Sequence, residues 1–472
     1  TPKLMSNFAV PTVEFLFDIQ SPWAYIASTR ISVIVRRTRA KVLWTPVSLG
    51  GVYEAVKAPQ SKAGNSTYVM GPQRATYHQL DFKRTLRRNN LKINYQPNHP
   101  VKSLDALRLL HATPDTHREQ LAHALYHSYW IQNNDISDRR LLLATAKELN
   151  IPSEYPLDNS IFTNTTIQER LRKATQRAVN LGAPDVPSFV INNYQNSGTE
   201  RLFWGQDRLH FVELALEQAS RGVSSFKEID NIDKYYPRCV KRGTKSDKER
   251  TLRFWFDFAS PWSFLAYTQL ERIRREAGDK VKIEYMPFLL GAVFRKLGMA
   301  DIPLFTMPKA NQQYWTFDLL DWTDFWNALA LQSDPNYKPF SFKWTQVFPI
   351  RSITALRVFL LEPKTIDCLF KASWQDDIPL GTSEEILANV LNKGGFDGPA
   401  LIQATKNNVN NVKDRLLKNT ELAVEKGLFG APIFQVDDGQ LVWGQDRINV
   451  VEDLLAGWED VDQSDNEVSA KL

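Results

Sequence analysis

The sequence is poor in cysteine and contains no long apolar run. Its 472 residues include two cysteines, Cys239 and Cys368, too few for a disulfide framework and typical of a reducing compartment. No segment approaches the ~18 consecutive apolar residues of a membrane-spanning helix, and no signal-peptide pattern opens the chain. We therefore expect neither a membrane partner nor a small secreted scaffold.

Histidine is also scarce, and positive and negative charges nearly balance. All seven histidines precede residue 211, so the second half cannot form a histidine-based metal site or activate a nucleophile with imidazole. His123 and His127 share a helical face but have no further ligands in the pattern, so we expect no metal. The net charge is only +5 and no basic stripe is present, which argues against a nucleic-acid partner.

The sequence does contain an internal repeat. Ser-Pro-Trp follows a short apolar run ending in Asp at Ser21 and again at Ser260, and Trp-Gly-Gln-Asp-Arg begins at Trp204 and at Trp443; both offsets are 239 residues. Weaker repeats lie between them in the same order, including Tyr-x-x-x-Asp from Tyr77 and from Tyr314. The chain therefore consists of two copies of one domain.

Composition changes mark the boundaries of the copies. We assign residues 9–225 to the first copy, 226–249 to an exposed linker, 250–458 to the second copy and 459–472 to an acidic, disordered tail.

Each copy has the pattern of an α/β domain. A buried strand is followed by a helix capped by Ser-Pro, a second strand, a long helical stretch (about 70–180 and 308–425), an X-Pro strand and a last helix. This is the order of a thioredoxin fold with an inserted helical domain, duplicated in tandem.

The motifs make the resemblance more specific. Phe-Asp-x-x-Ser-Pro-Trp, Leu-Gly-Gly/Ala, Tyr-x-x-x-Asp, Val/Ala-Pro-x-Phe and Trp-Gly-Gln-Asp-Arg together resemble the DsbA-like family, and within it the 2-hydroxychromene-2-carboxylate isomerases and kappa-class glutathione transferases. The resemblance covers nearly the whole chain twice. Because members of that family are homodimers, it implies that the two copies pack as an intrachain pseudo-dimer, so that the chain itself can be a monomer.

The resemblance assigns roles to several residues of each copy. Ser21 and Ser260 stand where a disulfide oxidoreductase has its reactive cysteine, so disulfide exchange is excluded and a serine hydroxyl is left to hold a glutathione thiolate. The alternative role of these serines is to cap their helices only. The residues expected to bind glutathione are Val186, Pro187, Asp207, Arg208, Ala431, Pro432, Asp446 and Arg447. For the Asp-Arg pairs, a cap plus a surface ion pair is the alternative.

Other positions concern the substrate. Trp23 and Trp262 are expected to line an aromatic pocket, with core packing as the alternative. Lys102 and Arg351 replace an asparagine of the resembled pattern, which indicates a more anionic substrate. The lysine of that pattern is Arg74 in one copy, and Asn311 stands there in the other.

These observations predict an enzyme with a small-molecule substrate. The leading expectation is a glutathione-dependent transferase or isomerase acting on a conjugated or aromatic, anionic metabolite, as in secondary metabolism. One alternative is a cofactor-free isomerase or cyclase in the same cleft. The other is a non-catalytic binding protein that no longer binds glutathione.

The sequence ends in Ser-Ala-Lys-Leu, and its last three residues fit the small-basic-leucine pattern of a peroxisomal address. We expect import into peroxisomes by the receptor for that address; a cytoplasmic location is the alternative. A fluorescent fusion carrying this C-terminus should collect in peroxisomes and become diffuse without Leu472. A diffuse signal from the intact tail would refute the expectation.

Overall fold

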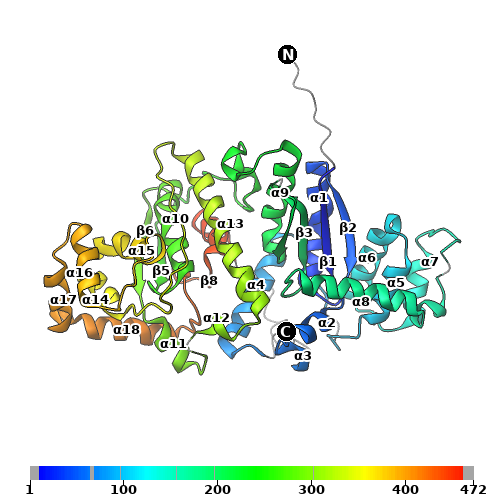
Figure 1. The fold of residues 1–472 in the computed structure, drawn as a ribbon, viewed down its shortest axis with the longest axis horizontal. Helices are drawn as coiled ribbons and strands as arrows, with labels where there is room; N and C mark the ends of the chain where they lie inside the picture. The colour runs from blue at the N-terminus through cyan, green and yellow to red at the C-terminus, as the bar shows by residue number, and fades with distance from the viewer. Residues whose placement is uncertain are drawn as a thin grey trace, which may run out of the picture.

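The computed structural model describes residues 10–63, 69–95, 97–155, 157–195, 197–300 and 302–460. Within them the chain forms two α/β units, each built on a four-stranded sheet, and the predicted fold class is confirmed. The two sheets lie on either side of the centre of the molecule (Figure 1).

The first sheet has the strand order β2-β1-β3-β4. Strand β1 (Thr12–Phe17) pairs in parallel with β2 (Lys41–Pro46) and antiparallel with β3 (Ser188–Tyr194), which pairs with β4 (Thr199–Trp204). Five of the six residues of β1 are buried, because helices cover both faces of this central strand.

The second sheet repeats this topology. Its order is β6-β5-β7-β8, formed by β5 (Arg250–Phe256), β6 (Val281–Pro287), β7 (Ile433–Val436) and β8 (Leu441–Trp443).

The helices fall into equivalent sets. Those next to the sheets are α1 (Pro22–Thr38), α9 (Leu209–Arg221), α10 (Pro261–Ala277) and α19 (Ile448–Leu455). The first insertion contains α2 (Leu49–Ala55), α3 (Gln60–Ala63), α4 (Pro72–Arg88), α5 (Leu104–Ala112), α6 (Asp115–Trp130), α7 (Arg139–Lys147) and α8 (Thr165–Asn180). The second contains α11 (Leu290–Lys296), α12 (Pro303–Thr306), α13 (Lys309–Ser333), α14 (Ile353–Leu361), α15 (Ile366–Trp374), α16 (Glu384–Lys393), α17 (Gly398–Lys406) and α18 (Val412–Glu425).

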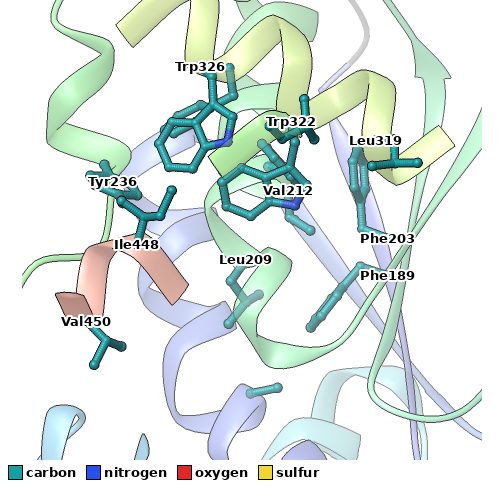
Figure 2. Close-up of a cluster of buried hydrophobic side chains, with 14 of the residues drawn as sticks. Phe189, Phe203, Leu209, Val212, Tyr236, Leu319, Trp322, Trp326, Ile448 and Val450 are labelled. Carbon is teal, nitrogen blue, oxygen red and sulfur yellow. The ribbon is translucent and has the colours of Figure 1, made fainter. Parts of the chain in front are cut away.

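Figure 1 shows how the two insertions are arranged. Helices α5 to α7 lie at one end of the molecule and α14 to α18 at the other, whereas α4 and α13 lie in the middle, between the two sheets. One apolar cluster includes residues of both copies. Figure 2 shows part of it: Trp322 and Trp326 of α13 lie beside Tyr236 and Ile448, close to Leu209 of α9.

Ion pairs also join the two copies, and they are reciprocal. Arg208 of the first copy donates from Nε and Nη2 to Asp318 of α13 (2.7 and 3.0 Å). Arg447 of the second copy donates to Asp81 of α4 (Nη2–Oδ2, 3.1 Å). A hydrogen bond also crosses between the copies: the hydroxyl of Tyr314 in the second copy accepts from the backbone N–H of Trp204 in the first (3.1 Å).

The segment between the copies differs from the expected exposed linker. Its first half forms two 3₁₀ turns, Phe226–Glu228 and Ile232–Tyr235, with Ile229 fully buried between them. Gln332 of α13 holds these turns by accepting from Ile232 N–H and donating to the Ile229 carbonyl, each at 2.8 Å. The apolar residues are too few and too widely spaced to give a recognisable period, so the sequence did not reveal this packing.

The beginning of the acidic tail also differs from the expected disorder. Asp460 is buried and accepts from Nε of Arg84 (2.8 Å) and from Nη2 of Arg87 (2.8 Å), both on α4 of the first copy. Residues 461–472, including the C-terminal Ala-Lys-Leu, lie outside the described residues.

The exchanged ion pairs predict a stability effect. Replacing Asp318 by Asn leaves the buried Arg208 guanidinium without its main carboxylate, which typically costs about 3–5 kcal/mol. Urea denaturation should show a loss of that order. As a control, Arg172→Gln removes an exposed pair with Glu169 and should change the unfolding free energy by less than about 0.5 kcal/mol. Equal effects of the two substitutions would contradict the structure.

Candidate functional site

Ser21 and Ser260 occupy equivalent positions at the ends of helices α1 and α10. Each is the N-cap, and its Oγ accepts a backbone N–H at 3.2 Å, from Ala24 in one copy and Ser263 in the other. Each hydroxyl also donates to the carbonyl before a proline, at Val186 (3.2 Å) and Ala431 (2.9 Å). The serines therefore cap their helices and also face the X-Pro loops.

Both X-Pro loops, at Pro187 and Pro432, contain cis peptide bonds. The carbonyl of each proline accepts the N–H of the glycine in Trp-Gly-Gln-Asp-Arg, at Gly205 (2.9 Å) and Gly444 (3.0 Å). These glycines have φ near +100°, and a Cβ would collide with the carboxylate two residues later. Each copy thus holds its serine, its X-Pro carbonyl and its Asp-Arg turn (Asp207-Arg208 or Asp446-Arg447) next to one another. We refer to this group of residues as the cleft of that copy.

Asp207 and Asp446 share the two arginines that follow them. Asp207 Oδ2 accepts from Arg208 (2.8 Å) and from Arg447 of the other copy (2.6 Å). Asp446 Oδ2 lies 3.2 Å from Arg447 and 3.0 Å from Arg208. Burial alone would raise the pKa of Asp207, but the two guanidinium groups hold that pKa well below its ordinary value.

The structure revises the role expected for Arg208 and Arg447. Both guanidinium groups are bound by protein carboxylates, and Arg208 is 3% exposed. They join the copies, so they do not present free donors to a ligand carboxylate. Asp207 and Asp446 retain side-chain exposures of 24% and 22%, which leaves them the accessible part of the motif.

The predicted aromatic residues are half-buried at the starts of their helices. Trp23 makes edge contacts with His78 and Phe82 of α4, at 5.4 and 5.0 Å between ring centroids. Trp262 makes one with Trp315 of α13 at 6.0 Å.

Residues of α4 and α13 also reach the opposite copy. Arg74 lies over the ring of Trp443, 5.6 Å from its centroid, and Trp315 contacts Trp204 at 5.7 Å. Trp443 and Trp204 open the Asp-Arg turns, so each copy supplies a side chain beside the other copy's cleft. Burial lowers the pKa of the Arg74 guanidinium, and no carboxylate within ion-pair distance is found for it among the described residues. Asn311 stands at the equivalent place.

Two expected substrate residues are not brought to these clefts. Lys102 and Arg351 precede helices α5 and α14 and are exposed. In the described part of the chain, neither forms a side-chain hydrogen bond or ion pair with a serine, an X-Pro loop or an Asp-Arg turn. The residue after Lys102 is the one that turns inward, since Ser103 donates to the buried Asp18 (3.1 Å).

Sequence reasoning missed a carboxylate in the first cleft. Asp185 precedes the Val186-Pro187 bond; its Oδ2 accepts from the Tyr53 hydroxyl (2.6 Å) and its Oδ1 from Val186 N–H (2.6 Å). Burial raises the pKa of Asp185 to about 6. In the second copy Gly430 stands there, and a Cβ would lie 2.6 Å from the Trp443 indole nitrogen. The difference between Asp185 and Gly430 at equivalent positions was the signal in the sequence that could have identified this carboxylate.

The described residues lack two further features. They contain no group of three or more His, Cys, Asp or Glu side chains arranged to hold a metal ion. None of their helices has the length and apolarity needed to cross a membrane.

The fold and the site define a class: a thioredoxin-like domain, present twice, with serine in place of the reactive cysteine. The family model described as "DSBA-like thioredoxin domain" matches residues 12–217 and 251–456. The chain therefore belongs to this family and contains two copies of its domain.

Relatives match over the length of one copy. Glutathione S-transferase kappa 2 of Caenorhabditis elegans is 26% identical over 214 residues, covering 44% of this chain and 92% of that protein. The 2-hydroxychromene-2-carboxylate isomerase of Sphingobium xenophagum is 22% identical over 208 residues, covering 43% and 96%. A solved structure of a 2-hydroxychromene-2-carboxylate isomerase gives a TM-score of 0.37 at 18% identity, covering 44% of this chain and 96% of that one.

The raised pKa of Asp185 predicts a pH dependence. The folded chain holds this proton more tightly than the unfolded chain, so Asp185 makes wild-type stability fall as pH rises from about 4 through 6. Asp185→Asn should therefore gain thermal stability relative to wild type over that interval. Asp138→Asn is the matched control, because backbone N–H bonding lowers the pKa of Asp138 and its trend should be opposite. Parallel pH curves for wild type and Asp185→Asn would refute the assignment.

Proposed function

We propose that this protein is a glutathione-dependent transferase or isomerase acting on a small conjugated or aromatic, anionic metabolite. The observation that carries the proposal is the serine N-cap facing an X-Pro carbonyl in both copies, at 3.2 and 2.9 Å. Relatives with this domain include proteins named glutathione S-transferase kappa and 2-hydroxychromene-2-carboxylate isomerase.

The geometry suits a bound thiolate. The first backbone N–H groups of α1 and α10 lie beside the serines, and the positive end of each helix dipole favours an anion there. Turning the serine hydroxyl from the carbonyl to the sulfur would add one charge-assisted hydrogen bond. A peptide-like ligand would find the X-Pro backbone on one side and the carboxylate of Asp207 or Asp446, for its ammonium group, on the other.

In the isomerase reaction that we propose, the thiolate adds to a conjugated carbonyl compound, a single bond rotates or a ring opens, and the thiolate leaves again. The covalent adduct divides one difficult step into two easier ones. The sulfur returns to its starting state, so no oxidant or reductant is consumed.

The second cleft is the better candidate for this chemistry. Arg74 lies over Trp443 beside it and lacks a carboxylate partner among the described residues, so it can attract an anionic group of glutathione or substrate. The first cleft has the neutral Asn311 at the equivalent place and adds the carboxyl of Asp185. In this proposal Arg74 binds the anionic group, the role expected from the sequence for Lys102 and Arg351.

A second function is favoured for the first cleft by the Asp185–Tyr53 pair. A carboxyl with a pKa of about 6 can both accept and donate a proton near neutral pH. Cofactor-free isomerisation by proton transfer is therefore the alternative activity there. In the second copy Phe294 follows Leu-Gly-Ala-Val where Tyr53 follows Leu-Gly-Gly-Val, and neither Phe294 nor Gly430 can transfer a proton.

Calorimetry tests the glutathione proposal. We expect saturable binding that Ser260→Ala weakens roughly 10- to 150-fold, since a hydrogen bond to a charged group contributes about 1.5–3 kcal/mol. Ser21→Ala should weaken it less than about threefold, because the first cleft lacks the cation. Thiolate absorbance of the bound ligand should fall in parallel with affinity.

The outcomes discriminate between the alternatives. No heat with glutathione would refute the thiol-dependent function and leave the cofactor-free enzyme or the binding protein. Equal losses from the two serine substitutions would show that the clefts are equivalent.

We also propose import into peroxisomes. The only support for this proposal is the terminal Ala-Lys-Leu of the sequence.

A further inference from the structure

A cavity of about 210 Å³ lies between the two copies and shares the Asp-Arg turns with the serine clefts. The described residues that line it come from α1, α4, the Asp-Arg turns, α9, α13, the segment 236–239 and α19, and they do not include Ser21, Ser260 or an X-Pro residue. Its arginines are Arg30, Arg84, Arg88, Arg238 and Arg447.

The two copies have different residues around this cavity. Helices α4 and α13 align through their Tyr-x-x-x-Asp motifs at an offset of 237 residues. At that offset Arg84, Thr85, Arg88 and Asn89 of α4 correspond to Asp321, Trp322, Phe325 and Trp326 of α13. Figure 2 shows the two tryptophans of α13 occupying the interior beside Tyr236 and Ile448.

One pair of equivalent contacts shows this difference between the copies directly. In the second copy the Trp326 indole donates to Gln445 Oε1 (2.6 Å). In the first copy the equivalent Gln206 Oε1 accepts instead from Arg30 Nη1 (2.9 Å), and the shorter Asn89 lines open space. Aromatic packing fills one side of the interface, whereas the other side is hollow and cationic.

Two of the arginines have unused donors. Arg30 donates only from Nη1, to the side chain and backbone of Gln206, and no carboxylate of the described residues lies within 4.0 Å of it. Arg84 is fully buried; Asp460 binds its Nε and Nη2, but its Nη1 forms no hydrogen bond and lies 3.9 Å from Asp81.

The carboxylates of the cavity are already neutralised. Asp81, Asp207 and Asp446 each pair with Arg447, and Asp207 and Asp446 also pair with Arg208. Burial lowers the pKa of Arg30 to about 10, and the charges of Asp207 and Glu213 offset only part of this shift. A buried cation with free donors is stabilised by an anion that accepts from it.

We propose that this cavity binds a compact oxyanion of the phosphate type, with Arg30 as its principal donor. The volume is about that of seven liquid waters, enough for one tetrahedral anion with part of its hydration. The source is free inorganic phosphate or the phosphoryl group of a small metabolite. The site does not depend on the proposed thiol chemistry.

Thermal unfolding with inorganic phosphate tests the proposal, with sodium chloride added to keep ionic strength constant. A ligand that binds only the folded state raises the midpoint progressively with its concentration. We expect such a rise for the wild type, and at least a tenfold loss of phosphate affinity by calorimetry in Arg30→Gln. Glutamine is the residue that the second copy has at this place, Gln269, where it is buried.

Two controls make the result specific. Arg140→Gln makes the same change at a side chain that is 94% exposed and should leave phosphate binding unaltered. Asn89→Trp introduces the residue of the other copy and should reduce phosphate binding by occupying the cavity. The double variant Ser21→Ala, Ser260→Ala should keep phosphate binding even if glutathione binding is lost, which separates this proposal from the proposed function.

The outcomes are decisive in both directions. No midpoint shift beyond that of sodium chloride would overturn the proposal, and so would equal phosphate affinity in wild type and Arg30→Gln. Glycerol phosphate distinguishes the sources: tighter binding than inorganic phosphate supports a phosphorylated metabolite, and weaker binding supports the free ion.

Discussion

The exchange of ion pairs between the copies is the constraint on which the rest of the structure depends. Arg208 begins the last helix of the first copy and is neutralised by Asp318 of the second; Arg447 is neutralised by Asp81 in return. Separating the copies would break the exchanged pairs and leave Arg208 only Asp207, and Arg447 only Asp446, as carboxylate partners. The same arginines hold Asp207 and Asp446, so the joint between the copies also sets the charge at both clefts.

Fusion of the copies into one chain permits asymmetry. In a symmetric dimer each substitution would occur at both clefts, whereas here α4 and α13 have diverged separately. The second cleft received Arg74 over Trp443, and the first received Asp185 beside its X-Pro bond. The interior between them is aromatic around Trp326 and cationic around Arg30. Two unlike clefts and one cavity follow from one duplicated domain.

Much of this fold could be predicted from local pattern. The offset between Ser21 and Ser260 identified the duplication, and the Ser-Pro steps placed the starts of α1 and α10, because capping and proline preferences act over a few residues. The X-Pro strands and the helical insertions were likewise local. The packed turns around Ile229 were not, since their burial depends on Gln332, about a hundred residues away.

The candidate site was predictable only in part. The serines and the X-Pro residues do lie next to each other, as expected of residues that the resemblance assigns to one ligand. The partners of Arg208 and Arg447 were missed: the sequence showed Tyr-x-x-x-Asp in each copy but not that its aspartate faces the opposite copy. The exposed positions of Lys102 and Arg351 depend on the paths of the loops between α4 and α5 and between α13 and α14, which residue type does not determine.

The central claim is that the two exchanged pairs form one network through Asp207 and Asp446. A double-mutant cycle on Asp81→Asn and Asp318→Asn, measured by urea denaturation, tests it most directly. Because both aspartates bind arginines that share the same two carboxylates, the losses should be non-additive by about 0.5–3 kcal/mol. Losses that add within about 0.3 kcal/mol would show two independent pairs and contradict the account.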